Sequence, residues 1–212
     1  MCAAGACLTE VADPKVADLA TGTGLFASLV VLPDGRLAVA FYDRTQHALE
    51  LAVESGAGTN MFSEASLDAT PAGDRGMWAS AAVDGSGTVH VAYQDALGDQ
   101  LMYTTWNGAP GTPEVVDDGQ RPGDRPHNVG AAAALYLVGG APAIAYQDGL
   151  DADVYVATRS AAGWSTMGIA TGPLLDGFSI GATTGHKGSP VLAWGALDPA
   201  GDPIGQLVVE SP

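Results

Sequence analysis

The feature that most constrains this chain is a strand-like segment that occurs four times at nearly regular intervals. Each copy runs through apolar residues to an alanine and then an aromatic residue, and three copies end in Asp two residues after it. Aligned on that alanine, successive copies are 52, 53 and 48 residues apart. A period of about 50 residues with strand-like content is typical of β-propeller blades. The copies span 37–43, 89–95, 142–148 and 190–196.

Further short runs flank each copy and predict the other strands of a blade. The run before each copy is rich in Ala, Ser and Gly, whose small side chains suit the innermost strand, where blades crowd the axis. Runs bounded by Gly, Pro, Asp and Asn indicate strands and turns, and no amphipathic helical stripe is present. The sequence therefore predicts an all-β fold. The expected strands are 26–31, 78–83, 129–135 and 180–184 before the copies, 49–53, 101–105, 154–158 and 207–209 after them, and 62–67, 114–116 and 164–169 as fourth strands.

The last copy ends at Pro212 without a fourth strand, whereas the N-terminus has a spare one. Residues 9–13 (Thr-Glu-Val-Ala-Asp) resemble residues 113–117 (Pro-Glu-Val-Val-Asp). We therefore expect the N-terminal segment to complete the last blade and close the ring, which removes free sheet edges. This predicts a four-bladed β-propeller as a single domain over 9–212, with residues 1–8 as a tail. A fragment of a larger ring is the alternative.

The repeat pattern also resembles a known kind of protein. An Asp-Gly turn, a strand ending in Ala-(Phe/Tyr)-x-Asp and a Leu/Val-rich strand together resemble uncharacterised bacterial β-propeller repeat proteins, from about residue 9 to residue 211. The resemblance implies blade architecture and says almost nothing about activity. Residues 82–88 approach the Asp-box of sialidases, Ser-x-Asp-x-Gly-x-Thr-Trp, but with a different glycine spacing.

Charge narrows the classes of partner. The formal net charge is −16, which argues against nucleic acid, whose phosphates need Lys and Arg for neutralisation. It argues equally against anionic lipid surfaces, and no apolar run approaches the ~20 residues of a membrane span. A closed ring with this charge should resist self-association, so we expect a monomer. The partners that remain are a small ligand, a glycan or a protein.

Cys2 and Cys7 are the only cysteines in the chain. They could close a small loop if the protein is exported, or remain two unpaired thiols in the tail. A lone pair with this spacing is not a four-ligand zinc site. Export would place the protein outside the cell, in the periplasm or on the cell surface.

Three aspartates end the repeated strands and are the candidate metal ligands. Asp43, Asp95 and Asp148 could form a ring of carboxylates on the loop face that we call the top, binding Ca²⁺ or another cation in the loops or the central channel. Alternatively, each is a turn-former that accepts hydrogen bonds from backbone amides after its strand. Recurrence at one place in three blades favours the turn-formers.

The candidate ligand-binding residues on the top rim include two arginines and a histidine. Arg75 and Arg125 are interpreted as equivalent, and they either form ion pairs with neighbouring aspartates or hold a ligand carboxylate. His127 is expected near the top of its inner strand, where the previous blade has Trp78. His127 and Trp78 are therefore candidate ligand contacts beside the axis.

Recurring aromatic residues complete the set of candidates. Tyr42, Tyr93, Tyr146 and Trp194 are interpreted as occupying one blade position. Such recurrence favours packing between blades or at the channel rim over sugar stacking. Tyr93 and Tyr146 are nevertheless retained as candidate ligand contacts.

No phosphate-binding loop, nucleophile elbow or haem-attachment motif is present, so no catalytic residue is assigned. The leading hypothesis is an exported, non-enzymatic binding or interaction module that uses the acidic top face or the central channel. The alternatives are a carbohydrate-acting hydrolase or lyase, which would use an Asp from the top loops with His127 or Arg125, and a structural spacer in a larger surface protein.

Overall fold

The computed structural model describes residues 2–3, 6–7, 22–184, 189–199 and 206–211. These residues form strands and turns without a helix, which confirms the predicted all-β class. None of them forms a helix long and apolar enough to cross a membrane.

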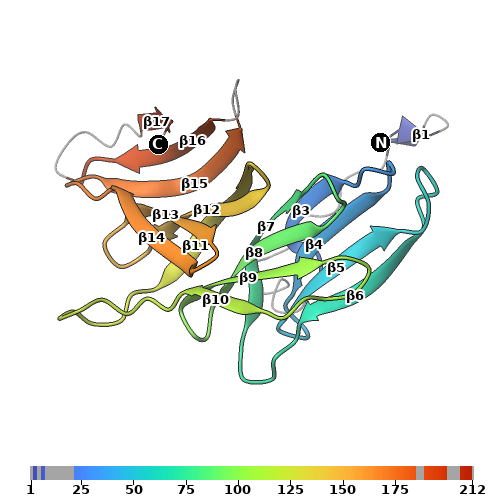
Figure 1. The fold of residues 1–212 in the computed structure, drawn as a ribbon, viewed down its shortest axis with the longest axis horizontal. Coiled ribbons are helices and arrows are strands. Elements are labelled where there is room, and N and C mark those ends of the chain that lie inside the picture. Colours follow the sequence, from blue (N-terminus) through green and yellow to red (C-terminus); the bar gives the residue numbers. More distant parts are fainter. Residues whose placement is uncertain (1, 4–5, 8–21, 185–188, 200–205, 212) are drawn as a thin grey trace.

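From β3 (Leu25–Val31) onward, the strands form four successive antiparallel sheets, one for each copy of the repeat. Within each sheet the strands lie side by side in chain order, as in a propeller blade (Figure 1). Blade 1 contains β3 (Leu25–Val31), β4 (Leu37–Asp43), β5 (Ala48–Glu54) and β6 (Phe62–Asp68). Blade 2 contains β7 (Arg75–Val83), β8 (Val89–Asp95), β9 (Gln100–Trp106) and β10 (Glu114–Asp117). Blade 3 contains β11 (Val129–Val138), β12 (Ala141–Asp148), β13 (Asp153–Ser160) and β14 (Gly163–Ala170). Blade 4 contains β15 (Leu175–Thr184), β16 (Pro190–Leu197) and β17 (Gln206–Glu210).

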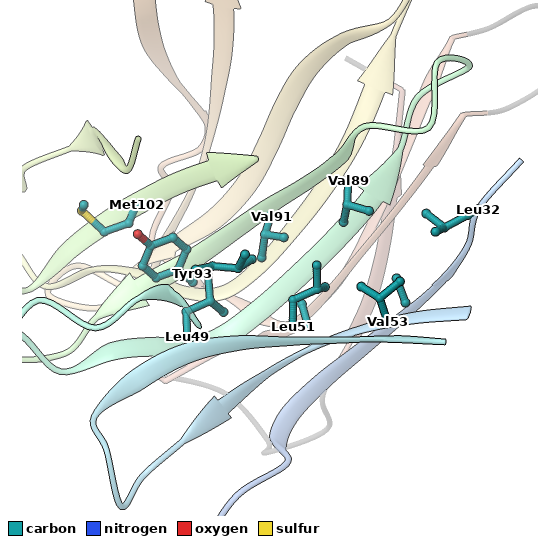
Figure 2. Packing of buried hydrophobic residues seen from close by; sticks show 11 residues of the cluster. Leu32, Leu49, Leu51, Val53, Val89, Val91, Tyr93 and Met102 are labelled. Atoms are coloured by element: carbon teal, nitrogen blue, oxygen red, sulfur yellow. The ribbon is translucent and has the colours of Figure 1, made fainter. Parts of the chain in front are cut away.

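The blades pack face to face, and their inner strands contact in the order β3, β7, β11, β15. Each junction buries its own apolar cluster. Figure 2 shows Leu49, Leu51 and Val53 of β5 lying opposite residues of β8 in the junction between blades 1 and 2. Alternation along each strand sends one set of side chains to the preceding blade and the other set to the following blade. The hydrophobic core therefore consists of separate clusters, one at each junction between neighbouring blades.

A bulge at the start of every inner strand recurs in all four blades. Gly24, Gly76, Gly130 and Gly177 have φ values of +83°, +114°, +94° and +89°. Two residues later, Phe26, Trp78, Ala132 and Ser179 have φ values between +50° and +54°. The strand register shifts at the same place in each blade. A bulge bends its strand and re-aims the next side chain, so the inner strand can turn from the top loops into the axis.

The glycine in this bulge is required by packing as well as by φ. A Cβ at Gly76 would lie 3.0 Å from the Cα of Leu49, and one at Gly130 would lie 3.0 Å from the Cα of Leu101. Leu49 and Leu101 belong to the third strand of the preceding blade. Each glycine thus allows one blade to approach the backbone of its neighbour.

Ring closure is not established by the described residues. The segment 9–13, predicted as the fourth strand of blade 4, lies outside them. The short strands β1 (Cys2–Ala3) and β2 (Ala6–Cys7) pair with Cys2 opposite Cys7, and the disulfide stays a prediction. Leu29 and Val31 at the start of the array and Leu207 and Val209 at its end are exposed.

Replacing Gly130 with Ala should destabilise the protein. The new Cβ would combine a left-handed conformation with a contact against fixed backbone, which we expect to lower the free energy of unfolding by at least about 2 kcal/mol. Urea denaturation measures the change. Gly85→Ala is the matched control, because a Cβ there has no atom within 4 Å. Equal stability of the two variants would show that the close approach at Gly130 is unimportant.

Candidate functional site

The four inner strands together line one cavity of about 300 Å³, which we call the axial cavity. Each strand contributes the left-handed residue of its bulge and the residue that follows. The cavity therefore lies where the four inner strands converge. The lining residues are Phe26, Ala27, Trp78, Ala79, Ala132, Ala133, Ser179 and Ile180.

Two aromatic side chains form one wall of the axial cavity. The ring centroids of Phe26 and Trp78 are 4.8 Å apart with the planes tilted by 44°. The two side chains remain 37% and 39% exposed. A second cavity of about 290 Å³, lined partly by Tyr42 and Arg44, touches Phe26 as well. Large aromatic residues rarely adopt a positive φ, because this conformation is strained. The bulge holds Phe26 and Trp78 in that conformation at a surface that a ligand can reach.

Trp78 is the one sequence-predicted contact that lines this cavity. Phe26 was missed. Its signal was the repeated spacing Gly24-Leu25-Phe26 and Gly76-Met77-Trp78, in which an aromatic residue follows a glycine by two positions.

The predicted tyrosines lie elsewhere. Tyr93 and Tyr146 are fully buried between blades. The hydroxyl of Tyr93 donates to Asp68 at 2.5 Å, and that of Tyr146 donates to Asp117 at 2.6 Å. Burial, together with the neighbouring carboxylate, raises the pKa of both phenols. The assignment of Tyr93 and Tyr146 as ligand contacts is thus corrected, because each ties its blade to the preceding one.

Arg75 is also committed to a junction between blades. Its guanidinium lies 3.1 Å from Asp95 in its own blade and 3.8 Å from Asp68 in the preceding one. The side chain is largely buried, and the two carboxylates neutralise its charge. The guanidinium of Arg75 is therefore not available to bind a ligand carboxylate.

Arg121, not Arg125, repeats this role at the next junction. Arg121 makes two hydrogen bonds of 2.9 Å to Asp117 and one of 3.3 Å to Asp148. Burial would raise the pKa of Asp117, but its hydrogen bonds with Arg121 and Tyr146 lower it overall. Arg125 lies in the loop before β11, where its backbone N–H donates to the side chain of Asp124. The predicted equivalence of Arg75 and Arg125 is wrong because the connecting loops differ in length.

The three predicted metal ligands are engaged by their own loops. Oδ1 of Asp43 accepts the backbone N–H groups of Thr45 and Gln46. Oδ1 of Asp95 accepts those of Asp74 and Leu97, and Oδ1 of Asp148 accepts that of Leu150. Within the described ranges, no three His, Cys, Asp or Glu side chains are arranged to hold one metal ion. These hydrogen bonds are those of the turn-formers that recurrence favoured, and the alternative ring of carboxylates is not formed by Asp43, Asp95 and Asp148.

His127 is buried at the top of blade 3, with 4% of its surface exposed. Its Nδ1 lies 2.6 Å from Oδ2 of Asp148 and 3.9 Å from Asp151, and its Nε2 lies 3.6 Å from Asp124. Burial alone would lower the pKa of His127, but the hydrogen bond and charge of Asp148, aided by Asp124 and Asp151, raise it overall. His127 thus connects acidic side chains of the loops at the top of blade 3.

Two carboxyl groups near His127 have pKa values shifted in opposite directions. Burial raises the pKa of Asp153, and the charges of Asp151, Asp148 and Asp176 add to the increase. The backbone N–H of Arg125 and the imidazole of His127 lower the pKa of Asp124. Such a separation is what a proton donor and an ionised partner require.

Protonation of His127 should stabilise the fold at low pH. Because its folded-state pKa is raised, its contribution is complete below the ordinary value of 6.5 and is lost as pH rises through the folded-state pKa. The difference in unfolding free energy between the wild type and His127→Gln should therefore shrink from pH 5.5 to pH 8.5. An NMR titration of the imidazole gives the pKa directly, and a value below 6.5 would contradict this assignment.

No protein-family model and no curated protein sequence matches the chain. Solved structures share its fold. A bifunctional GH43-CE protein of Bacteroides eggerthii matches with a TM-score of 0.54 and 12% identity, over 91% of this chain and 24% of that one. An exo-β-1,3-galactanase of Clostridium thermocellum matches with a TM-score of 0.51 and 14% identity, over 87% of this chain and 45% of that one. The leech intramolecular trans-sialidase matches with a TM-score of 0.52 and 13% identity, over 86% and 31%.

At these identities the likeness establishes the β-propeller type of fold, and this chain spans less than half the length of each of the three structures. The expectation of a non-enzymatic binding module is corrected by this comparison, because two of these neighbours are named as carbohydrate-acting enzymes, a galactanase and a trans-sialidase. The alternative, a carbohydrate-acting hydrolase or lyase, fits them better.

Proposed function

We propose that this protein is a carbohydrate-acting hydrolase that binds a sugar ring in the axial cavity. The observation that carries the proposal is the pair of half-exposed aromatic rings, Phe26 and Trp78, on one wall of that cavity. The negative face of an aromatic ring attracts the slightly positive C–H groups on the flat side of a sugar. The two tilted rings offer such a surface.

The opposite wall leaves room for the sugar. Blades 3 and 4 contribute Ala132, Ala133 and Ser179 to it, together with Ile180. The volume of about 300 Å³ lies at the lower end of the range for ligand sites. That size suits one sugar ring, with the rest of a chain extending into solvent.

For the chemical step we propose two carboxyl groups that both lie near His127 at the top of blade 3, Asp153 as the proton donor and Asp124 as its ionised partner. Glycoside hydrolysis uses one protonated and one ionised carboxyl group, and the surroundings of these two separate their pKa values in that sense. The glycoside oxygen takes the proton from Asp153 as its bond to the anomeric carbon breaks. Asp124 activates the water that replaces the leaving group.

Two further expectations belong to this proposal. The segment 9–13 forms the fourth strand of blade 4 beside β17, since the described part of that blade has three strands. The protein acts outside the cell, where Cys2 and Cys7 can pair. Neither expectation changes the residues assigned to the site.

Replacing Trp78 with Ala should weaken sugar binding about tenfold or more, because one stacking surface is lost. Isothermal titration with a panel of oligosaccharides measures the affinity. Trp78→Phe keeps an aromatic face and should retain most of it. Trp106→Ala is the matched control, because Trp106 lies at the far end of β9, outside the axial cavity. Unchanged affinity in Trp78→Ala would overturn the assignment of the site.

Replacing Asp153 with Asn should abolish proton donation while leaving binding intact. We expect kcat on a cleaved oligosaccharide to fall by about 10²–10⁴-fold, with little change in the dissociation constant. Asp34→Asn is the control, since Asp34 is an exposed carboxylate in the turn between β3 and β4. Full activity in Asp153→Asn would remove Asp153 from the mechanism, and the absence of cleavage across the panel by the wild type would overturn the hydrolase.

A further inference from the structure

The chain contains three asparagines, Asn60, Asn107 and Asn128, and of these Asn107 alone is followed by a glycine. The side-chain carbonyl carbon of an asparagine can be attacked by the backbone nitrogen of the next residue. A side chain on that next residue obstructs the attack, and glycine has none. The pair Asn107-Gly108 is therefore the most reactive of the three, provided that the fold leaves both groups free.

Asn128 is held by hydrogen bonds on both of the groups that would react. Its amide nitrogen donates to Asp99, and its amide oxygen accepts a hydrogen bond of 2.9 Å from Nε2 of Gln94. The backbone N–H of Val129, which would be the attacking group, donates to the carbonyl of Asp99 at 3.1 Å. The contact between blades 2 and 3 therefore protects Asn128 from this reaction.

Asn60 is exposed, but the backbone on either side of it is held in place. Its own N–H donates to Oε1 of Glu54 at 2.9 Å. The N–H of Met61, the attacking group at this position, donates to Oγ1 of Thr59 at 3.4 Å. The long side chain of Met61 adds bulk beside that nitrogen, so we expect Asn60 to react slowly.

Asn107 and Gly108 lie in the exposed turn that follows β9. Within the described part of the chain, neither the side-chain amide of Asn107 nor the N–H of Gly108 has a hydrogen-bond partner. Gly108 has a φ of +75°, and a Cβ built on it would have no atom within 4 Å. The attacking nitrogen and the group that it attacks are therefore both unrestrained.

We propose that Asn107 is a modification site at which the folded protein deamidates without an enzyme. The backbone nitrogen of Gly108 loses its proton and forms a bond to Cγ of Asn107. The bond from Cγ to the side-chain nitrogen breaks, ammonia leaves with that proton, and a succinimide ring remains. Water then adds to one of the two carbonyl carbons of the ring and opens it to aspartate or isoaspartate, so water is the co-reactant.

The reaction would change the wall of a cavity of about 330 Å³ between blades 1 and 2. Asn107 and Gly108 line this cavity together with Trp106, Asp34 and Arg36. Nε of Arg36 donates to Asp34 at 2.7 Å, so the cavity already holds one basic and one acidic side chain. Deamidation adds a second carboxylate there and takes the formal net charge of the chain from −16 to −17.

Peptide mapping by mass spectrometry tests the proposal on the full chain, incubated at 37 °C at pH 6.0, 7.5 and 9.0. Asn107 should convert at least about tenfold faster than Asn60 or Asn128 in the same sample, because those two must first break hydrogen bonds. Its rate should rise with pH, since the attacking nitrogen has to lose its proton. Chromatography separates the aspartate and isoaspartate products.

A synthetic peptide of residues 103–111 with blocked ends gives the rate without the fold, and Asn107 in the folded chain should convert at a similar rate. Asn107→Gln should stay unmodified, because its longer side chain would have to form a larger ring. A folded chain that keeps Asn107 intact after the peptide has converted, or equal rates at the three asparagines, would overturn the proposal. No sugar takes part in this measurement, so its outcome is independent of the proposed hydrolase.

Discussion

The close approach of the inner strands β7 and β11 to the backbone of the preceding blade is the constraint on which the structure depends. It needs a glycine at the first turn of the strand, and a left-handed residue follows two positions later. The contact fixes how far apart neighbouring blades stand, and the bulge fixes which side chains reach the axis. Both the scaffold and the candidate site therefore follow from one local backbone feature.

Hydrogen bonds across the junctions reinforce the same approach. The backbone N–H at the start of β7 donates to the carbonyl of His47, and the corresponding groups of β11 and β15 donate to Asp99 and Ala152. These three acceptor residues all have φ values between +54° and +56°. The turns that contain these residues direct a backbone carbonyl to the next blade. The aspartates at the start of those turns, Asp43, Asp95 and Asp148, therefore stabilise the packing of neighbouring blades.

The sequence predicted the strands well because a period of 2 within a repeat near 50 residues is visible in one dimension. It could not place residues whose equivalence depends on loops. Within the repeated strands, alignment on the alanine already pairs Phe41 with Tyr93, as strand pairing confirms, so grouping Tyr42 with Tyr93 was wrong and Tyr42 corresponds to Gln94. Arg121 escaped notice because it lies in the loop before β11, which is longer than the loop before β7, whereas Arg75 is the first residue of β7. Phe26 was missed although the spacing Gly24-Leu25-Phe26 repeats that of Gly76-Met77-Trp78, because the positive φ that turns these side chains to the axis is visible only in the structure.

Features that recur in every blade belong to the scaffold of this chain, whereas side chains that differ between blades point to the candidate site. The left-handed bulge occurs in all four blades, so the conformation itself belongs to the architecture. The side chains that it presents differ: Phe26 and Trp78 from blades 1 and 2, and Ala132 and Ser179 from blades 3 and 4. Packing around the axis alone would be satisfied by four small residues. Two large aromatic rings at the positions where blades 3 and 4 have Ala132 and Ser179 break the symmetry of the repeat, and the sugar binding proposed above would use that asymmetry.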